Sequence, residues 1–85
     1  MINEIAQISG AGRGQAGWFH VTQASVGYDH AAHTQAEHAL LLDFVNPSLG
    51  AGARVALELN LASGKALVET LQAAIKAAEE SGVRE

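Results

Sequence analysis

The sequence predicts a single α+β domain, spanning residues 1–85, in which a four-stranded antiparallel β-meander is followed by a C-terminal helix packed on one face. Three observations support this fold class. Apolar and polar residues alternate cleanly over residues 54–62, the connections between strand-like segments are short and rich in turn residues, and the apolar spacing becomes helical after residue 62. The predicted element order is therefore ββββα.

Four segments have the composition or the alternation of strands, and they cover residues 2–9, 18–30, 37–46 and 54–62. Before the second of them lies the stretch GAGRGQAGW, in which Gly12, Gly14 and Gly17 fit the pattern G-x-G-x-x-G. A dinucleotide site of that kind needs a helix that starts at the glycine turn, whereas the residues after Gly17 are strand-like. We therefore interpret the glycines as a turn and not as a nucleotide site.

The C-terminal segment, residues 63–82, has the spacing of an amphipathic helix. Its apolar positions recur at helical intervals and are Leu67, Val68, Leu71, Ile75 and Ala78. Ser63 is the predicted N-cap, and Gly82 suits the left-handed position after the last turn. We expect this stripe to cover the apolar face of the sheet.

Pairing the second and third strands fixes a register. With His30 opposite His38, one face collects the apolar pairs Tyr28–Leu40, Val26–Leu42 and Ala24–Phe44. The fourth strand then adds Val55, Leu57 and Leu59 to the same face. This face and the helix stripe form the predicted core.

The opposite face also carries large apolar side chains among its polar ones, namely Phe19, Val21, Leu41 and Val45. One helix cannot cover both faces of a sheet, and a solvated face is normally polar. We interpret these four residues as an interface for a homo-oligomer, a dimer or larger, or for a larger protein partner. Association would also supplement the core of so small a chain.

Three histidines fall within nine positions in the stretch YDHAAHTQAEH. In the register above, His30 and His38 are cross-strand neighbours, and His33 lies in the connection between them. Three imidazoles, with Asp29 or Glu37 as a further ligand, suit zinc, nickel, copper or iron. The alternative interpretation is that these rings are solvated or hydrogen-bonded, or respond to pH without metal.

Composition excludes several classes of function. The net charge is −4 with five scattered basic residues, so we expect no nucleic-acid partner. No apolar run approaches the length of a membrane helix and the N-terminus lacks signal-peptide features, so we expect no membrane and a soluble, cytoplasmic protein. The chain has no cysteine and no serine in a nucleophile-elbow context, so no catalytic residue is assigned.

The motifs GRGQAGWFHVTQASVGYDH, AEHALLLDFVNP and ARVALEL resemble those of a family of short, functionally uncharacterised, mostly actinobacterial proteins. The resemblance spans nearly the whole chain. It implies a compact bacterial domain without an assigned activity. It marks motif positions with no defined role, which are Trp18, Phe19, Asp29, His30, Glu37, His38, Asp43, Asn46 and Pro47. Asp43 and Asn46 also suit hydrogen bonds at a strand end or the start of the Asn-Pro turn.

The leading hypothesis is a non-enzymatic accessory or assembly module that self-associates through its sheet. The alternative is a transition-metal-binding protein that uses His30, His33 and His38. A third hypothesis is a small enzyme with a pocket between protomers near the same histidines.

Overall fold

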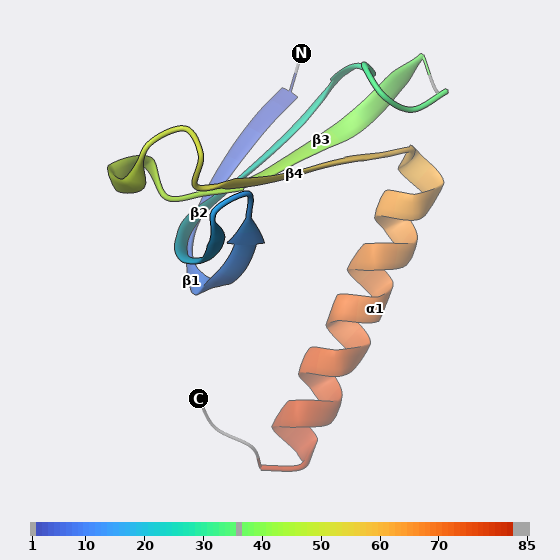
Figure 1. The fold of residues 1–85 in the computed structure, drawn as a ribbon. Coiled ribbons are helices and arrows are strands. Elements are labelled where there is room, and N and C mark those ends of the chain that lie inside the picture. The colour runs from blue at the N-terminus through green and yellow to red at the C-terminus, as the bar shows by residue number, and fades with distance from the viewer. Residues whose placement is uncertain (1, 36, 83–85) are drawn as a thin grey trace.

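The computed structural model describes residues 2–35 and 37–82, and within these it shows four strands and one α-helix (Figure 1). The strands form one antiparallel sheet in the order β1-β2-β3-β4. The elements are β1 (Ile2–Gly14), β2 (Gly17–His30), β3 (His38–Val45), a short 3-10 helix (Pro47–Leu49), β4 (Arg54–Leu59) and α1 (Leu61–Glu80). The predicted ββββα fold is confirmed.

The register of the three central strands is also the predicted one. His30 lies opposite His38, and the apolar pairs follow it along the ladder: Tyr28–Leu40, Val26–Leu42 and Ala24–Phe44. On the other side of β3, Leu59, Leu57 and Val55 lie opposite Leu40, Leu42 and Phe44. We call the surface that carries these nine side chains the apolar face, and the opposite surface, which carries Ser25, Asp43 and Glu58, the polar face.

Strand β1 is longer than predicted, because the glycine run continues the strand and does not form the turn. Gly10, Gly12 and Gly14 all pair with β2, and the turn consists of Gln15 and Ala16. Gly17 alone of these glycines has a positive φ, of 115°. The next residues continue directly into β2, so the helix that a dinucleotide site would need does not begin at these glycines.

The far end of the β1–β2 hairpin curls over β4. The register of β1 against β2 shifts between Gln7 and Gly10, and such a bulge increases strand twist. A Cβ on Gly14 would lie 3.2 Å from the backbone oxygen of Gly52, so β1 runs close to the chain that enters β4. The glycines of β1 thus permit a close approach of two backbones.

This curl corrects the predicted position of Phe19 and Val21. A Cβ on Gly12 would lie 2.9 Å from Val21 Cγ2 and 3.5 Å from both Phe19 Cζ and Val55 Cγ2, so both side chains turn toward the apolar face. Val21 is only 5% exposed. The predicted patch of Phe19, Val21, Leu41 and Val45 is therefore not one exposed surface, because strict alternation assumes a flatter strand. Leu41 and Val45 are half-buried.

Asn46 organises the connection between β3 and β4. Its Oδ1 accepts the N–H of Ser48 at 3.1 Å, which caps the 3-10 helix, and its Nδ2 donates to the carbonyl of His20 at 2.9 Å. The side chain is buried with both ends bonded. The expected role of Asn46 in starting the Asn-Pro turn is confirmed.

Helix α1 begins three residues earlier than predicted. Asn60 is the N-cap, and its Oδ1 accepts the N–H of Ser63 at 2.8 Å, so the predicted cap Ser63 lies inside the first turn. Because Asn60 directly follows β4, the strand also ends at Leu59. At the other end Gly82 has a φ of 78°, which confirms the predicted left-handed residue.

The helix does not cover the apolar face as expected. It contacts the sheet through its first turns, where a Cβ on Gly64 would lie within 2.2 Å of Leu40 Cδ1, and then runs away from the sheet (Figure 1). Gly64 is its buried residue. Only one residue, Asn60, connects β4 to the helix, and Gly64 packs against Leu40 of the sheet. These two constraints set the direction of the helix.

Candidate functional site

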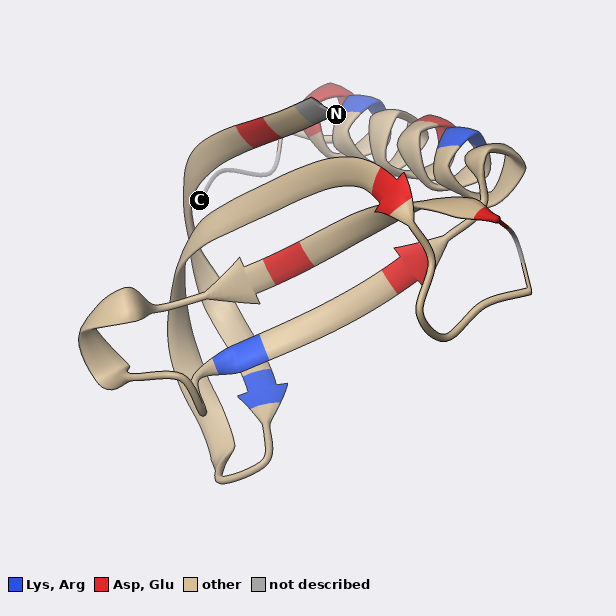
Figure 2. Cartoon of the chain, turned by 90° about the horizontal axis from the view of Figure 1, so that it is seen from above, with Lys and Arg blue, Asp and Glu red and all other residues tan. Residues whose placement is uncertain are grey.

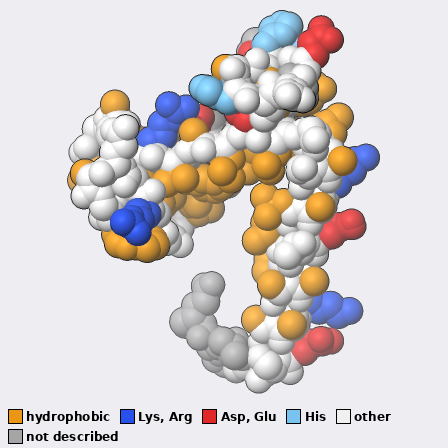
Figure 3. Space-filling view, turned by 45° about the vertical axis from the view of Figure 1, so that its right-hand side comes forward, with side chains coloured by type: hydrophobic (Ala, Val, Ile, Leu, Met, Phe, Trp, Pro, Cys, Tyr) orange, Lys and Arg blue, Asp and Glu red, His pale blue; other side chains and the backbone are white. Residues whose placement is uncertain are grey.

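Two apolar surfaces of the chain face an open space. The helix stripe, which we define as Leu67, Val68, Leu71 and Ile75, is between 37% and 56% exposed. On the sheet, Leu57 of the apolar face is 42% exposed. In Figure 3 the hydrophobic side chains line the underside of the sheet and the adjacent side of the helix, with a hollow between them.

The chain exposes much more surface than a compact domain of its mass. Its accessible area is 6528 Å², whereas a folded monomer of 8.8 kDa exposes about 4,800 Å². Its radius of gyration is 14.4 Å, compared with about 12 Å for a compact chain of this length. Among the described residues, no large side chain is fully buried. The apolar core is thus only partly enclosed by the single chain.

An apolar hollow of about 450 Å³ lies where the β1–β2 hairpin curls toward β4. Val21, Phe44 and Val55 form part of its wall, and Trp18, which is 72% exposed, stands at its edge. This hollow continues the apolar face toward the hairpin. Trp18 and Phe19, two motif positions of the sequence, both lie in this part of the molecule.

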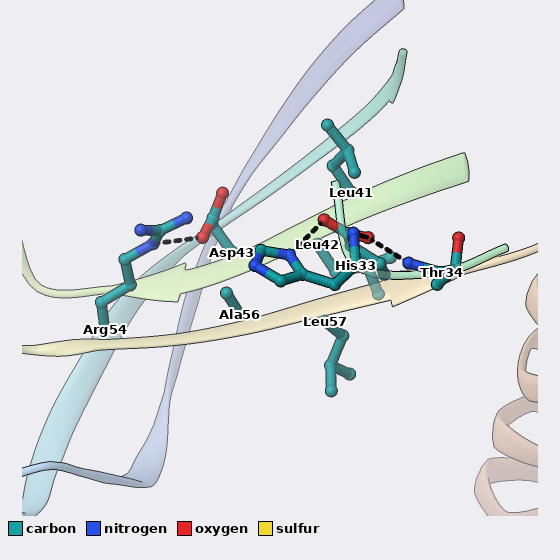
Figure 4. A pocket seen from close by; sticks show the side chains of 9 residues that line it. His33, Thr34, Leu41, Leu42, Asp43, Arg54, Ala56 and Leu57 are labelled. Carbon is teal, nitrogen blue, oxygen red and sulfur yellow. Dashed lines mark hydrogen bonds and ion pairs between the residues drawn. The ribbon is translucent and has the colours of Figure 1, made fainter. Parts of the chain in front are cut away.

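The polar face is organised by Glu58 of β4. Its carboxylate accepts the backbone N–H groups of Ala32, His33 and Thr34 at 3.3, 2.7 and 3.1 Å, and His33 Nδ1 lies 2.9 Å from Glu58 Oε2 (Figure 4). One side chain thereby fastens the β2–β3 connection to the sheet. We call these four contacts the Glu58 cluster.

The Glu58 cluster holds the carboxylate in its charged form. The hydrogen bond from His33 is the main cause, the backbone N–H groups add to it, and together they lower the pKa of Glu58 from 4.5 to about 2. The Glu58 side chain is 16% exposed and the His33 side chain 85% exposed. The carboxylate is therefore a structural acceptor at neutral pH.

A cleft of about 490 Å³ runs along the polar face, with the Glu58 cluster at one end and an ion pair at the other (Figure 4). That pair joins Arg54 Nε to Asp43 Oδ1 at 2.5 Å, between residues that are near neighbours on β4 and β3. Both carboxylates of the cleft are thus engaged by other residues of the chain. The role of Asp43 is therefore to pair with Arg54 and connect β3 to β4.

The structure separates the predicted histidine cluster into two parts. His30 and His38 lie together on the side of the sheet that carries the apolar face, with ring centroids 4.4 Å apart and ring planes tilted by 32°. Tyr28 stacks on His38 at 5.7 Å. His33, in contrast, is bound to Glu58 on the polar face. The expected convergence of all three rings is wrong, because Glu58 draws the connection to the other side.

The two predicted carboxylate ligands do not join the histidines either. Asp29 Oδ1 accepts the backbone N–H of its neighbour His30 at 2.7 Å. Glu37 is exposed, and its carbonyl accepts the N–H of Ala31. Within residues 2–35 and 37–82, no three His, Asp or Glu side chains are grouped closely enough to hold a metal ion together. The five-residue metal site is therefore not assembled in the single chain.

Within residues 2–35 and 37–82, the charged residues form no extended field of one sign. Lys and Arg positions are dispersed over strand ends and the helix in the part of the chain that is described (Figure 2). In that same part, no helix combines the length and the hydropathy that crossing a bilayer requires.

Residues 1–84 match the sequence model of DUF6295, a family of unknown function. The chain belongs to this family. The match confirms the resemblance to an uncharacterised family over nearly the whole chain. No curated protein and no solved structure matched the chain. Membership of DUF6295 therefore shows which proteins the chain is related to, but it assigns no activity to them or to this chain.

Three residues that position these surfaces were missed by sequence reasoning. Glu58, Asn60 and Gly64 carry the loop closure, the helix cap and the helix–sheet contact. A signal existed only for Asn60, since Asn is among the residues preferred at the N-cap of a helix. In the sequence, Glu58 looks like an ordinary polar residue of an alternating strand. Its role is hidden because its hydrogen-bond partners lie 24 to 26 residues away.

Proposed function

We propose that the protein is a non-enzymatic, self-associating module in which two copies complete each other's core. In this arrangement the helix stripe of one copy packs on the apolar face of the other, and the reverse contact follows by two-fold symmetry. The proposal includes the cytoplasmic location expected from the sequence. The observation that carries it is the pair of exposed apolar surfaces on one chain.

The area available fits a second copy. The excess over a compact monomer is roughly 1,700 Å² per chain, which exceeds the ~800 Å² that each partner contributes to a standard interface. Twice this excess falls within the range of about 2,000–5,000 Å² found for obligate homodimers. The surplus surface is thus of the size that a permanent interface buries.

The helix itself needs such a partner. It has 20 residues, and most helical stability in proteins comes from packing of an amphipathic face. Its own sheet does not supply that packing, because the contact at Gly64 directs the helix away. A second copy offers the same apolar face without that constraint.

The sheet side of the interface differs from the one expected from the sequence. Phe19 and Val21 contribute to the apolar face from the curled hairpin, and Leu57 and its neighbours extend it. Leu41 and Val45 stay outside the proposed contact. The proposed interface therefore lies on the apolar face and not on the opposite one.

A matched pair of helix variants tests the proposal. Leu71→Asp places a charge in the stripe, whereas Ala73→Asp introduces the same charge on the opposite side of α1. By light scattering after size exclusion, we expect the parent and Ala73→Asp to have about twice the 8.8 kDa chain mass, and Leu71→Asp to lose the dimer. A parent that is monomeric throughout, or a dimer that survives Leu71→Asp, would refute the proposal.

A further inference from the structure

Among the described residues, the His30–His38 pair is a cluster of titratable side chains on the sheet that has no role so far. The two residues close the β2–β3 ladder and lie directly opposite each other. His30 is exposed, whereas His38 is half-buried and stacked on Tyr28. One ring is thus held in place while the other is open to solvent.

The separation of the two rings is close to that of two ligands on one metal ion. A nitrogen–metal distance of 2.0–2.1 Å and ligand angles between a right angle and a tetrahedral one place the imidazole centroids about 4.5–5.2 Å apart. The observed separation is 4.4 Å. The His30 ring is exposed, so rotation about its side-chain torsions can adjust this separation.

The surroundings favour a site of two nitrogen ligands. Asp29 is engaged by the His30 backbone and His33 by Glu58, so neither supplies a further donor to the pair. Imidazole donors suit zinc, nickel and copper, whereas calcium and magnesium require oxygen ligands. The chemistry of the pair thus selects one class of ion.

We propose that His30 and His38 bind one divalent transition-metal ion per chain, with water in the remaining coordination positions. The site is smaller than the His30, His33 and His38 site expected from the sequence, because His33 belongs to the Glu58 cluster. It does not depend on self-association, since both ligands come from one chain. Tyr28 acts as a positioning residue that orients the His38 ring.

The four histidines of the chain provide a test with internal controls. The full chain, without a polyhistidine tag and freed of metal with a chelator, is titrated with zinc chloride by calorimetry. We expect one ion per chain, and at least a roughly tenfold weaker affinity for His30→Gln and for His38→Gln, since even an outer-shell change costs about 10–100-fold. His20→Gln and His33→Gln should bind zinc like the parent.

Proton NMR provides a second readout. It detects zinc binding on the parent protein alone, so this result does not depend on whether the variants fold. Zinc should shift the ring signals of two of the four histidines, and the variants identify them as His30 and His38. The proposal fails if zinc does not bind, if His33→Gln weakens binding as much as His38→Gln, or if all four ring signals shift together.

Discussion

On the polar face of the sheet, Glu58 accepts three backbone N–H groups and contacts the ring of His33, whereas on the apolar face the adjacent Leu57 remains 42% exposed. The two residues are neighbours on one strand and point to opposite sides. The chain thus supplies all the hydrogen-bond donors of the Glu58 carboxylate from its own β2–β3 connection. It leaves its apolar side only partly buried, and we infer that the protein self-associates through this exposed apolar surface.

The largest expected effect comes from a truncation at the centre of the apolar face. Leu42 is 9% exposed, and Leu42→Ala should lower the free energy of unfolding by about 2–4 kcal/mol, because a buried cavity forms. Urea unfolding measures the change. Leu49→Ala is the matched control, since Leu49 is 59% exposed and its loss should change stability by less than about 0.5 kcal/mol. Equal effects at both positions would mean that the apolar face is not a core.

A smaller effect is expected where the helix meets the sheet. Alanine is normally a better helix residue than glycine by about 1 kcal/mol, yet Gly64→Ala should bring no such gain and should lose up to about 1 kcal/mol. The added Cβ would lie 2.2 Å from Leu40 Cδ1, so the end of the Leu40 side chain must move, at a cost that offsets the gain in helix propensity. Thermal unfolding with Ser63→Ala as control checks this. A Gly64→Ala protein that is more stable by the full ~1 kcal/mol would show that the helix does not touch the sheet there.

The smallest effect concerns the polar face and depends on pH. Because the pKa of Glu58 is lowered to about 2 in the folded protein, its contribution to stability is complete above about pH 4.5 and declines as the pH falls toward 2. Glu58→Gln should therefore have a lower urea midpoint than the parent at pH 6, and the two midpoints should converge toward pH 2.

Glu37→Gln, which removes a carboxylate from the same connection, is the control for this experiment. It should leave the pH dependence of the parent unchanged. If the difference between the parent and Glu58→Gln stays constant from pH 6 to pH 2, the Glu58 cluster does not fasten the connection.

The sequence predicted well those features that depend on alternation. The pairing of His30 with His38, and of β3 with β4, follows from placing apolar residues on one face, because a shift by one residue would reverse every side chain. The same argument failed at Phe19 and Val21, since a bulge between Gln7 and Gly10 changes the twist of the hairpin.

The position of the helix stripe relative to the sheet could not be predicted from a sequence pattern. Helical spacing shows that Leu67, Leu71 and Ile75 share a side that needs burial, but it does not show which chain provides the cover. The helix direction depends on the contact between Gly64 and Leu40, which are far apart in sequence. The histidine site failed for a related reason, because the partner of His33 is Glu58, 25 residues away.

The concentration dependence of thermal unfolding tests the central claim most directly. If two copies complete one core, folding and association are a single event, and the unfolding midpoint must rise with protein concentration. A hundredfold increase should stabilise the dimer by about 2.7 kcal/mol, which corresponds to a rise of roughly 5–10 °C. A cooperative transition whose midpoint is the same at all concentrations would contradict the account, because the single chain would then hold its fold alone.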